Sequence, residues 1–131
     1  MANVPTDLRY TEDHEWARTA SDTVRIGITD YAQKQLGDIV YVELPKKGDR
    51  FEATEPFGSV ESVKAVTELY MPVTGTVTAV NEMLNDSPED VNTDAYGDGW
   101  LIEVKVADRA QLDGLLDAKK YQAYCEAEAA G

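Results

Sequence analysis

The stretch Val60-Glu61-Ser62-Val63-Lys64-Ala65-Val66 decides the fold expected for this chain. An alternating segment ends at Val63 and another opens at Val66, so the sequence predicts a tight hairpin with Lys64 at its tip. A lysine in a turn is usually a solvated charge. Here its neighbours are small or uncharged, which suits an enzyme that acylates an amine by main-chain recognition of a turn. We therefore interpret Lys64 as an attachment point.

Segments with strand character follow one another at short intervals on both sides of this hairpin. They are predicted at residues 23–28, 38–44, 57–63, 66–71, 76–80 and 100–106. A loop rich in Asn, Asp and Pro is expected from residue 81 to about residue 98. This pattern predicts a mainly β chain, folded as a small sandwich or barrel with helical additions.

Helix signals interrupt the strands at three places. Thr29 offers an N-cap and Gly37 a C-terminal stop, which predicts a helix of about two turns between them. Asp108, with Gln111 three residues later, is a weak capping-box signal. The alanine- and glutamate-rich tail at 117–130 is predicted to be a C-terminal helix that packs on one face.

The composition restricts the classes of partner. The 131 residues suggest one domain with a modest core. With 25 acidic and 12 basic side chains, the net charge of -13 disfavours nucleic acid and anionic membranes, and it favours solubility and basic protein surfaces. No apolar run is long enough to span a bilayer.

Single cysteine and histidine residues leave little room for metal or disulfide chemistry. Cys125 has no second cysteine to pair with, and His14 belongs to no cluster with zinc-site spacing. Cys125 shares a helical face with Tyr121 and Tyr124, which indicates packing. The segment Met1–Asp7 has neither a secretory nor a transit pattern, so we expect a cytoplasmic protein, or one of the mitochondrial matrix if the chain is already processed.

Enzyme motifs are absent from the sequence. There is no nucleophile elbow, phosphate loop or dinucleotide fingerprint, and His14 has no serine or cysteine motif to activate. Gly97-Asp98-Gly99 precedes a predicted strand and lacks the lysine of a phosphate loop, so it is interpreted as a turn. A non-catalytic protein is the better hypothesis.

At this point the sequence resembles the H proteins of the glycine cleavage system over nearly its whole length. The matching segments are His14-Glu15-Trp16, Gly27 to Ala32, Leu36 to Pro45, Val60 to Ala65, Pro72 to Gly75 and Asn92 to Trp100. Lipoyl domains also carry glycines 16 positions before and 11 positions after the modified lysine, and Gly48 and Gly75 occupy those positions around Lys64.

The resemblance implies a lipoyl-domain fold, in which two small antiparallel sheets form a flattened β-barrel or sandwich, a barrel-sandwich hybrid. It implies lipoic acid in amide linkage to Lys64. We expect a single lipoyl-carrier domain over residues 1–131, with a core at about 8–107 and a C-terminal helical extension at about 108–131.

The same resemblance implies the partners. A pyridoxal-phosphate glycine decarboxylase loads an aminomethyl group on the arm and releases carbon dioxide. An aminomethyltransferase passes the methylene to tetrahydrofolate and frees ammonia, and dihydrolipoamide dehydrogenase reoxidises the dithiol. A lipoate ligase or a lipoyl or octanoyl transferase attaches the arm. We expect a monomer, because a shuttle must release each partner quickly.

A carrier that folds its loaded arm into a surface cleft would protect it from hydrolysis. The amine on the arm is cationic, so Glu15 is the first candidate for an acidic cleft residue and Glu68 the second. The alternative is that His14 and Trp16 pack while Glu15 is a solvated charge. The side chains at 68–71 are bulkier than expected in the family, which affects the details of this cleft.

Recognition of the hairpin is assigned to the residues next to the lysine. Glu61 resembles the acidic position that helps the attaching enzyme select this turn, with Val63 and Ala65 flanking the amine. A biotin carrier shares the fold but typically has methionines at those flanking positions. A lipoyl domain of a 2-oxo acid dehydrogenase has Asp before the lysine and a Pro/Ala-rich linker. A lipoyl relay to other proteins and an unmodified binding module remain alternatives.

Overall fold

Two antiparallel sheets form the part of the chain that the structure describes, residues 3–130 of a computed structural model. The six-stranded sheet has the order β1 Arg9–Tyr10, β2 Glu15–Ala20, β3 Thr23–Ile28, β9 Ile102–Val106, β8 Gly75–Val80 and β5 Arg50–Phe51. The three-stranded sheet has the order β4 Ile39–Glu43, β6 Pro56–Ser62 and β7 Val66–Tyr70. Three residues lie outside the described part of the chain. They are Met1 and Ala2, from the segment expected to have no secretory or transit pattern, and Gly131, from the expected C-terminal extension.

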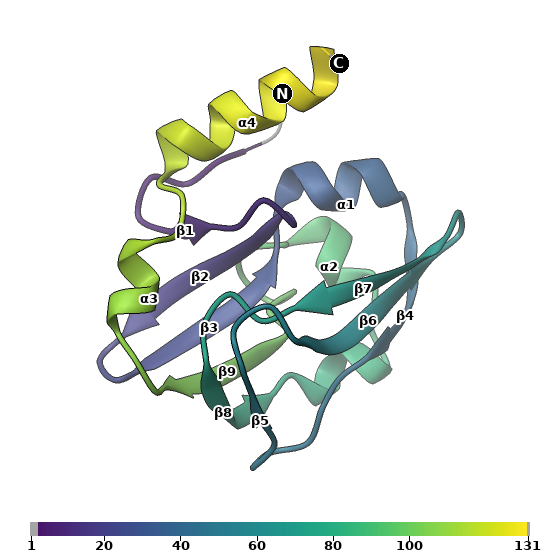
Figure 1. Cartoon of the computed structure of the whole chain (residues 1–131). Helices are drawn as coiled ribbons and strands as arrows, with labels where there is room; N and C mark the ends of the chain where they lie inside the picture. The colour runs from purple at the N-terminus through teal and green to yellow at the C-terminus, as the bar shows by residue number, and fades with distance from the viewer. Residues whose placement is uncertain (1–2, 131) are drawn as a thin grey trace.

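Short helices connect and cover the sheets (Figure 1). They are α1 Asp30–Leu36, the 3-10 helix η1 Glu82–Asn85, α2 Asp90–Thr93, α3 Ala110–Asp113 and α4 Ala118–Ala130. Two unclosed sheets with these helices confirm the predicted mainly β class and the flattened barrel-sandwich. None of the helices in the described residues is long and apolar enough to cross a membrane.

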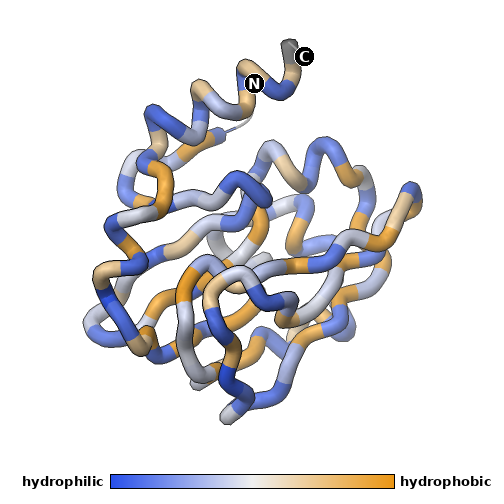
Figure 2. The backbone as a smooth tube through the Cα atoms, viewed as in Figure 1, coloured by the Kyte–Doolittle hydropathy of each residue, from blue (hydrophilic) through white to orange (hydrophobic). Residues whose placement is uncertain are grey.

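The main core lies between the two sheets. Alternation along the strands turns Ile26 and Val104 of the large sheet inward, where they share one apolar cluster with Val42, Val60 and Leu69 of the small sheet. Figure 2 shows the apolar residues that recur along these strands. Each large side chain buried in this way contributes about 1.5–3 kcal/mol relative to full exposure, so this cluster holds the two sheets face to face.

A second apolar cluster joins the C-terminal helix to the edge of the large sheet. The rings of Tyr10 and Tyr121 stack with centroids 4.5 Å apart, and Trp16 is fully buried in the same cluster. The Trp16 indole donates a hydrogen bond of 3.0 Å to the carbonyl of Ala95. Cys125 is buried here too, which confirms its predicted packing role. α4 therefore lies over β1 and β2 (Figure 1).

The helix boundaries confirm one prediction and correct two others. The Thr29 hydroxyl caps α1 by accepting from the N–H of Ala32 at 3.1 Å, and Gly37 ends the helix. The expected loop at 81–98 contains η1 and α2. The helix signalled by Asp108 and Gln111 forms as α3, and the Asp108 carboxylate accepts from the N–H of Ala110 at 3.0 Å, but the box is incomplete because the Gln111 side chain bonds to Thr74 across the fold.

Candidate functional site

The tip of the β6–β7 hairpin is a short turn of Val63, Lys64 and Ala65. The backbone N–H of Ser62 donates to the carbonyl of Ala65 at 2.8 Å, which closes the turn. The buried Ser62 hydroxyl also accepts from the N–H groups of Lys64 at 3.1 Å and Ala65 at 3.2 Å. These bonds fix the backbone around the lysine, as a turn-forming serine side chain can.

Lys64 lies on the surface against the C-terminal end of α1. Its ammonium donates a long hydrogen bond of 3.5 Å to the carbonyl of Gln35, in the last turn of that helix. The side-chain stem passes Gly37, where an added Cβ would lie 3.5 Å from Lys64 Cε. Helix C-termini attract cations weakly, so the amine is oriented while it stays exposed.

The side chain of Asn92 forms hydrogen bonds to residues 37 and 39, next to the hairpin tip. Its side-chain oxygen accepts from the N–H of Ile39 at 2.8 Å, and its amide nitrogen donates to the carbonyl of Gly37 at 2.9 Å. The adjacent carbonyl of Asp38 accepts from the N–H of Val63 at 3.0 Å. Sequence reasoning matched Asn92 to a family motif but gave it no role, because these contacts span the fold.

Glu15 is a buried carboxylate at the start of β2, with 1% of its surface exposed. One oxygen accepts from the backbone N–H of Tyr70 at 2.8 Å, and the other accepts from the Thr11 hydroxyl at 3.0 Å. Burial raises the pKa of Glu15 to about 8; the two hydrogen bonds oppose that shift and the Asp13 carboxylate adds to it. The alternative of a solvated Glu15 is wrong, whereas Trp16 does pack.

A surface pocket of about 420 Å³ opens beside Glu15. Among the side chains that line it are Thr11, Asp13, Glu15, Thr54, Met71 and Leu116. Tyr70, next to this pocket, is six residues from Lys64, which is about 20 Å along an extended strand. Glu68 is absent from the lining; it lies on the exposed face of β7 and accepts from the Tyr70 hydroxyl at 3.4 Å.

The predicted site residues thus fall into two groups. Glu61, Val63 and Ala65 are exposed around Lys64 at the hairpin tip. Glu15 lies at the other end of β7, where Tyr70 bonds to it through the backbone and to Glu68 through the hydroxyl. Sequence reasoning did not assign roles to Ser62 or Tyr70, although the serine two positions before the lysine is a turn-type residue.

Known proteins resemble this chain over almost its full length. A family model described as "Glycine cleavage H-protein" matches residues 8–128. The glycine cleavage system H protein of Geobacillus kaustophilus is 59% identical over 121 residues, covering 92% of this chain and 95% of that protein. That of Halalkalibacterium halodurans is 56% identical over 122 residues, covering 93% and 95% respectively.

A solved structure has the same fold. The crystal structure of a glycine cleavage system H protein from Mycobacterium marinum superposes with a TM-score of 0.84 at 40% sequence identity. The match covers 92% of this chain and 97% of the crystallised chain, so the two sheets and the helices around them are shared.

Proposed function

The chain belongs to the glycine cleavage H-protein family, and from this premise we propose that it carries lipoic acid on Lys64. The family supplies the lipoyl-carrier component of the glycine cleavage system. The observation that carries the proposal is the exposed Lys64 amine on a turn that the Ser62 hydroxyl fixes.

The surroundings of Lys64 fit an amide-linked arm. Among the described residues the ammonium forms no ion pair, and its polar contact is the long hydrogen bond to the Gln35 carbonyl. Acylation removes the positive charge of Lys64, and the only polar contact that this change weakens is the long hydrogen bond to the Gln35 carbonyl. Val63 and Ala65 flank the amine without bulky or charged groups, and Glu61 marks the hairpin for the attaching enzyme.

Lipoic acid, when bound, would supply a dithiolane that is reduced as it takes up the aminomethyl group, and its dithiol form would later give up two electrons. The chain contributes a place to hold the loaded arm. β7 is an edge strand that leads from the hairpin toward the pocket beside Glu15. We assign Glu15 to the cationic amine of the arm and Glu68 to the rim of the pocket; the exposed Glu68 carboxylate attracts positive charge, and a cation beside Glu15 favours the deprotonated form of that buried carboxyl.

This carrier works without catalysing a reaction of its own. Its proposed partners are glycine decarboxylase, aminomethyltransferase, dihydrolipoamide dehydrogenase and the lipoate ligase or lipoyl or octanoyl transferase. We propose a cytoplasmic monomer that acts as one lipoyl-carrier domain over residues 1–131, with its core at about 8–107 and an extension at about 108–131. The net charge of -13 supports partners with basic surfaces.

Glycine-dependent release of carbon dioxide by purified glycine decarboxylase tests the role in the system. The chain, expressed with lipoate and its ligase, should support turnover, and Lys64→Arg should abolish it. Lys47→Arg is the matched control, because Lys47 is another exposed turn lysine and should leave turnover unchanged. Full turnover with Lys64→Arg would contradict the proposal, and so would a biotin group in place of lipoate on Lys64.

A further inference from the structure

A pocket with two arginines in its lining lies at the β1 edge of the large sheet, and we call it the arginine pocket. Its volume is about 430 Å³, which is within the usual range of small-molecule sites. It shares no lining residue with the pocket beside Glu15. In Figure 1, α3 and the β2–β3 turn lie on the opposite side of the molecule from the tip of the β6–β7 hairpin. The residues that line the arginine pocket are Arg9, Thr19, Arg109, Ala110, Leu112 and Asp113.

Both guanidinium groups belong to well-placed residues and lack an acidic partner. Arg9 stands between the buried Leu8 and Tyr10, which fix its backbone. Arg109 precedes α3, and its Nη1 donates to the carbonyl of Ser21 in the β2–β3 turn at 2.7 Å. Neither arginine forms an ion pair within residues 3–130. Their remaining N–H groups are therefore available to a ligand.

The other lining residues add a hydroxyl, an apolar surface and one carboxylate. The Thr19 hydroxyl has no hydrogen-bond partner in the described part of the chain. Leu112 is buried and belongs to the main core, so it gives the lining an apolar portion. Asp113 is the one carboxylate of the lining, and it forms no ion pair with a described residue.

The charge of the arginine pocket differs from that of the whole molecule. Acidic side chains outnumber basic ones by 25 to 12 in the chain, whereas two arginines accompany one carboxylate here. Asp22 and Asp108 are close to the pocket in sequence, but neither lines it. Physiological salt screens charges over about 8 Å, so a small anion in the pocket responds mainly to the two arginines. A long polyanion would extend beyond them and meet the acidic remainder of the surface.

We propose that the arginine pocket binds a small organic phosphate that carries hydroxyl groups. Arginine matches phosphate oxygens in geometry and charge, and the Thr19 hydroxyl adds a further donor. A phosphate ion alone fills only a small part of about 430 Å³, so the remaining space accommodates an organic portion against Leu112. The Asp113 carboxylate repels phosphate but accepts hydrogen bonds from hydroxyl groups, which favours an ester with hydroxyls on that portion. The inference goes beyond the proposed function, because binding here involves neither Lys64 nor the lipoyl arm.

Titration of the isotope-labelled chain with ribose 5-phosphate tests the arginine pocket. The backbone amide resonances should shift saturably, and the largest shifts should fall on Arg9, Thr19 and residues 109–113. Inorganic phosphate should bind about tenfold more weakly, the equivalent of about 1.4 kcal/mol, and ribose should not bind. All titrations use one ionic strength and a pH above the second phosphate pKa of about 6, where the phosphate is a dianion.

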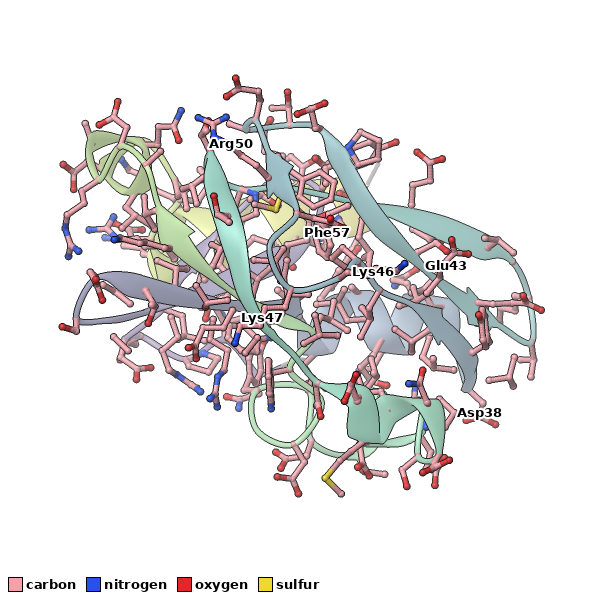
Figure 3. The ribbon with its side chains drawn as sticks, turned by 90° about the horizontal axis from the view of Figure 1, so that it is seen from below. Asp38, Glu43, Lys46, Lys47, Arg50 and Phe57 are labelled. Carbon is pink, nitrogen blue, oxygen red and sulfur yellow. The ribbon has the colours of Figure 1, made fainter. Side chains whose placement is uncertain are left out.

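Single variants locate the binding. Arg9→Gln and Arg109→Gln should each weaken the affinity for ribose 5-phosphate about tenfold. Arg50→Gln is the matched control, because it removes the same charge from β5, at the opposite edge of the large sheet from β1 (Figure 3). This control should keep the affinity of the unaltered chain. Unfolding midpoints verify that the variants fold, and Arg9→Gln tests the pocket without disturbing the contact between Arg109 and Ser21.

Three results would overturn the inference. The first is the absence of saturable shifts with ribose 5-phosphate. The second is an equal loss of affinity in Arg50→Gln and the two pocket variants, which would mean general electrostatic attraction. The third is tighter binding of a phosphoserine peptide than of ribose 5-phosphate, which would assign the pocket to a modified protein. None of these titrations depends on Lys64, so each of these results leaves the proposed carrier function intact.

Discussion

Glu15 accepts a 2.8 Å hydrogen bond from the backbone N–H of Tyr70. The bond connects β2 of the large sheet to β7, the edge strand that begins two residues after Lys64. It also places a carboxylate with a raised pKa on the wall of the pocket assigned to the arm. Stability and arm binding are therefore both expected to depend on the charge of Glu15.

Glu15→Gln should change how stability depends on pH. Burial raises the pKa of Glu15 from an ordinary 4.5 to about 8, so between these values the folded chain holds a proton that the unfolded chain releases. The free energy of unfolding therefore falls as pH rises through this range, by at most about 1.4 kcal/mol per pH unit. Glu15→Gln should flatten this slope, which urea unfolding between about pH 5 and about pH 8 can measure.

Glu68→Gln is the matched control for this experiment, because it removes a carboxylate that is exposed on β7. It should leave the slope close to that of the unaltered chain. Identical slopes for Glu15→Gln and the unaltered chain would contradict the assigned charge behaviour of Glu15.

Ser62→Ala should slow acylation of Lys64 and weaken the hairpin. The substitution leaves the N–H groups of Lys64 and Ala65 without the hydroxyl acceptor, at a cost of about 1 kcal/mol in unfolding free energy. Time-resolved intact mass during lipoylation measures the rate. Ser59→Ala, on the same strand, should match the unaltered chain; equal rates for both variants would show that the hydroxyl does not position the lysine.

Gly27→Ala should destabilise the packing of the C-terminal helix. A Cβ at Gly27 would lie 2.6 Å from the Trp16 indole, which is fully buried and has little room to move. Overpacking of this kind costs about 1–3 kcal/mol. Chemical unfolding with tryptophan fluorescence measures the loss. Gly114→Ala, whose Cβ would meet its nearest neighbour at 3.6 Å, should be tolerated, and equal stability of the two variants would contradict this reading.

Tyr121→Phe should loosen α4 without disturbing its ring packing. The hydroxyl lies 2.6 Å from Thr29 Oγ1 and 2.8 Å from His14 Nδ1, and both contacts disappear in the variant. We expect a loss of about 1–2 kcal/mol and faster amide hydrogen exchange in α4. Unchanged amide hydrogen exchange in the variant would mean that stacking of the Tyr121 ring on Tyr10 stabilises the helix without help from the hydroxyl.

The sequence pattern predicted six of the nine strands of the described residues, the capped helix and the lysine turn, because each depends on residues close together in the chain; it missed β1, β2 and β5. Alternation sets which strand residues face the core, and Thr29 and Gly37 act within a few residues of α1. The Glu61 to Ala65 segment is likewise a local turn. These features follow from periodicity and turn chemistry.

Long-range contacts could not be predicted in the same way. Asn92 bonds to residues more than 50 positions earlier. The Gln111 side chain was expected to cap a nearby helix, but it bonds to Thr74. The burial of Glu15 depends on Tyr70, which is 55 positions later. Each of these contacts exists only after the two sheets meet, so no local pattern encodes it.

Attachment of lipoic acid to Lys64 is the central claim, and mass measurement tests it most directly. The chain is expressed with lipoate and lipoate ligase, its intact mass is recorded, and peptides that span the hairpin are mapped. We predict one lipoyl increment, located on Lys64 and absent from Lys64→Arg. An unmodified chain, or an increment that persists in Lys64→Arg, would contradict the account.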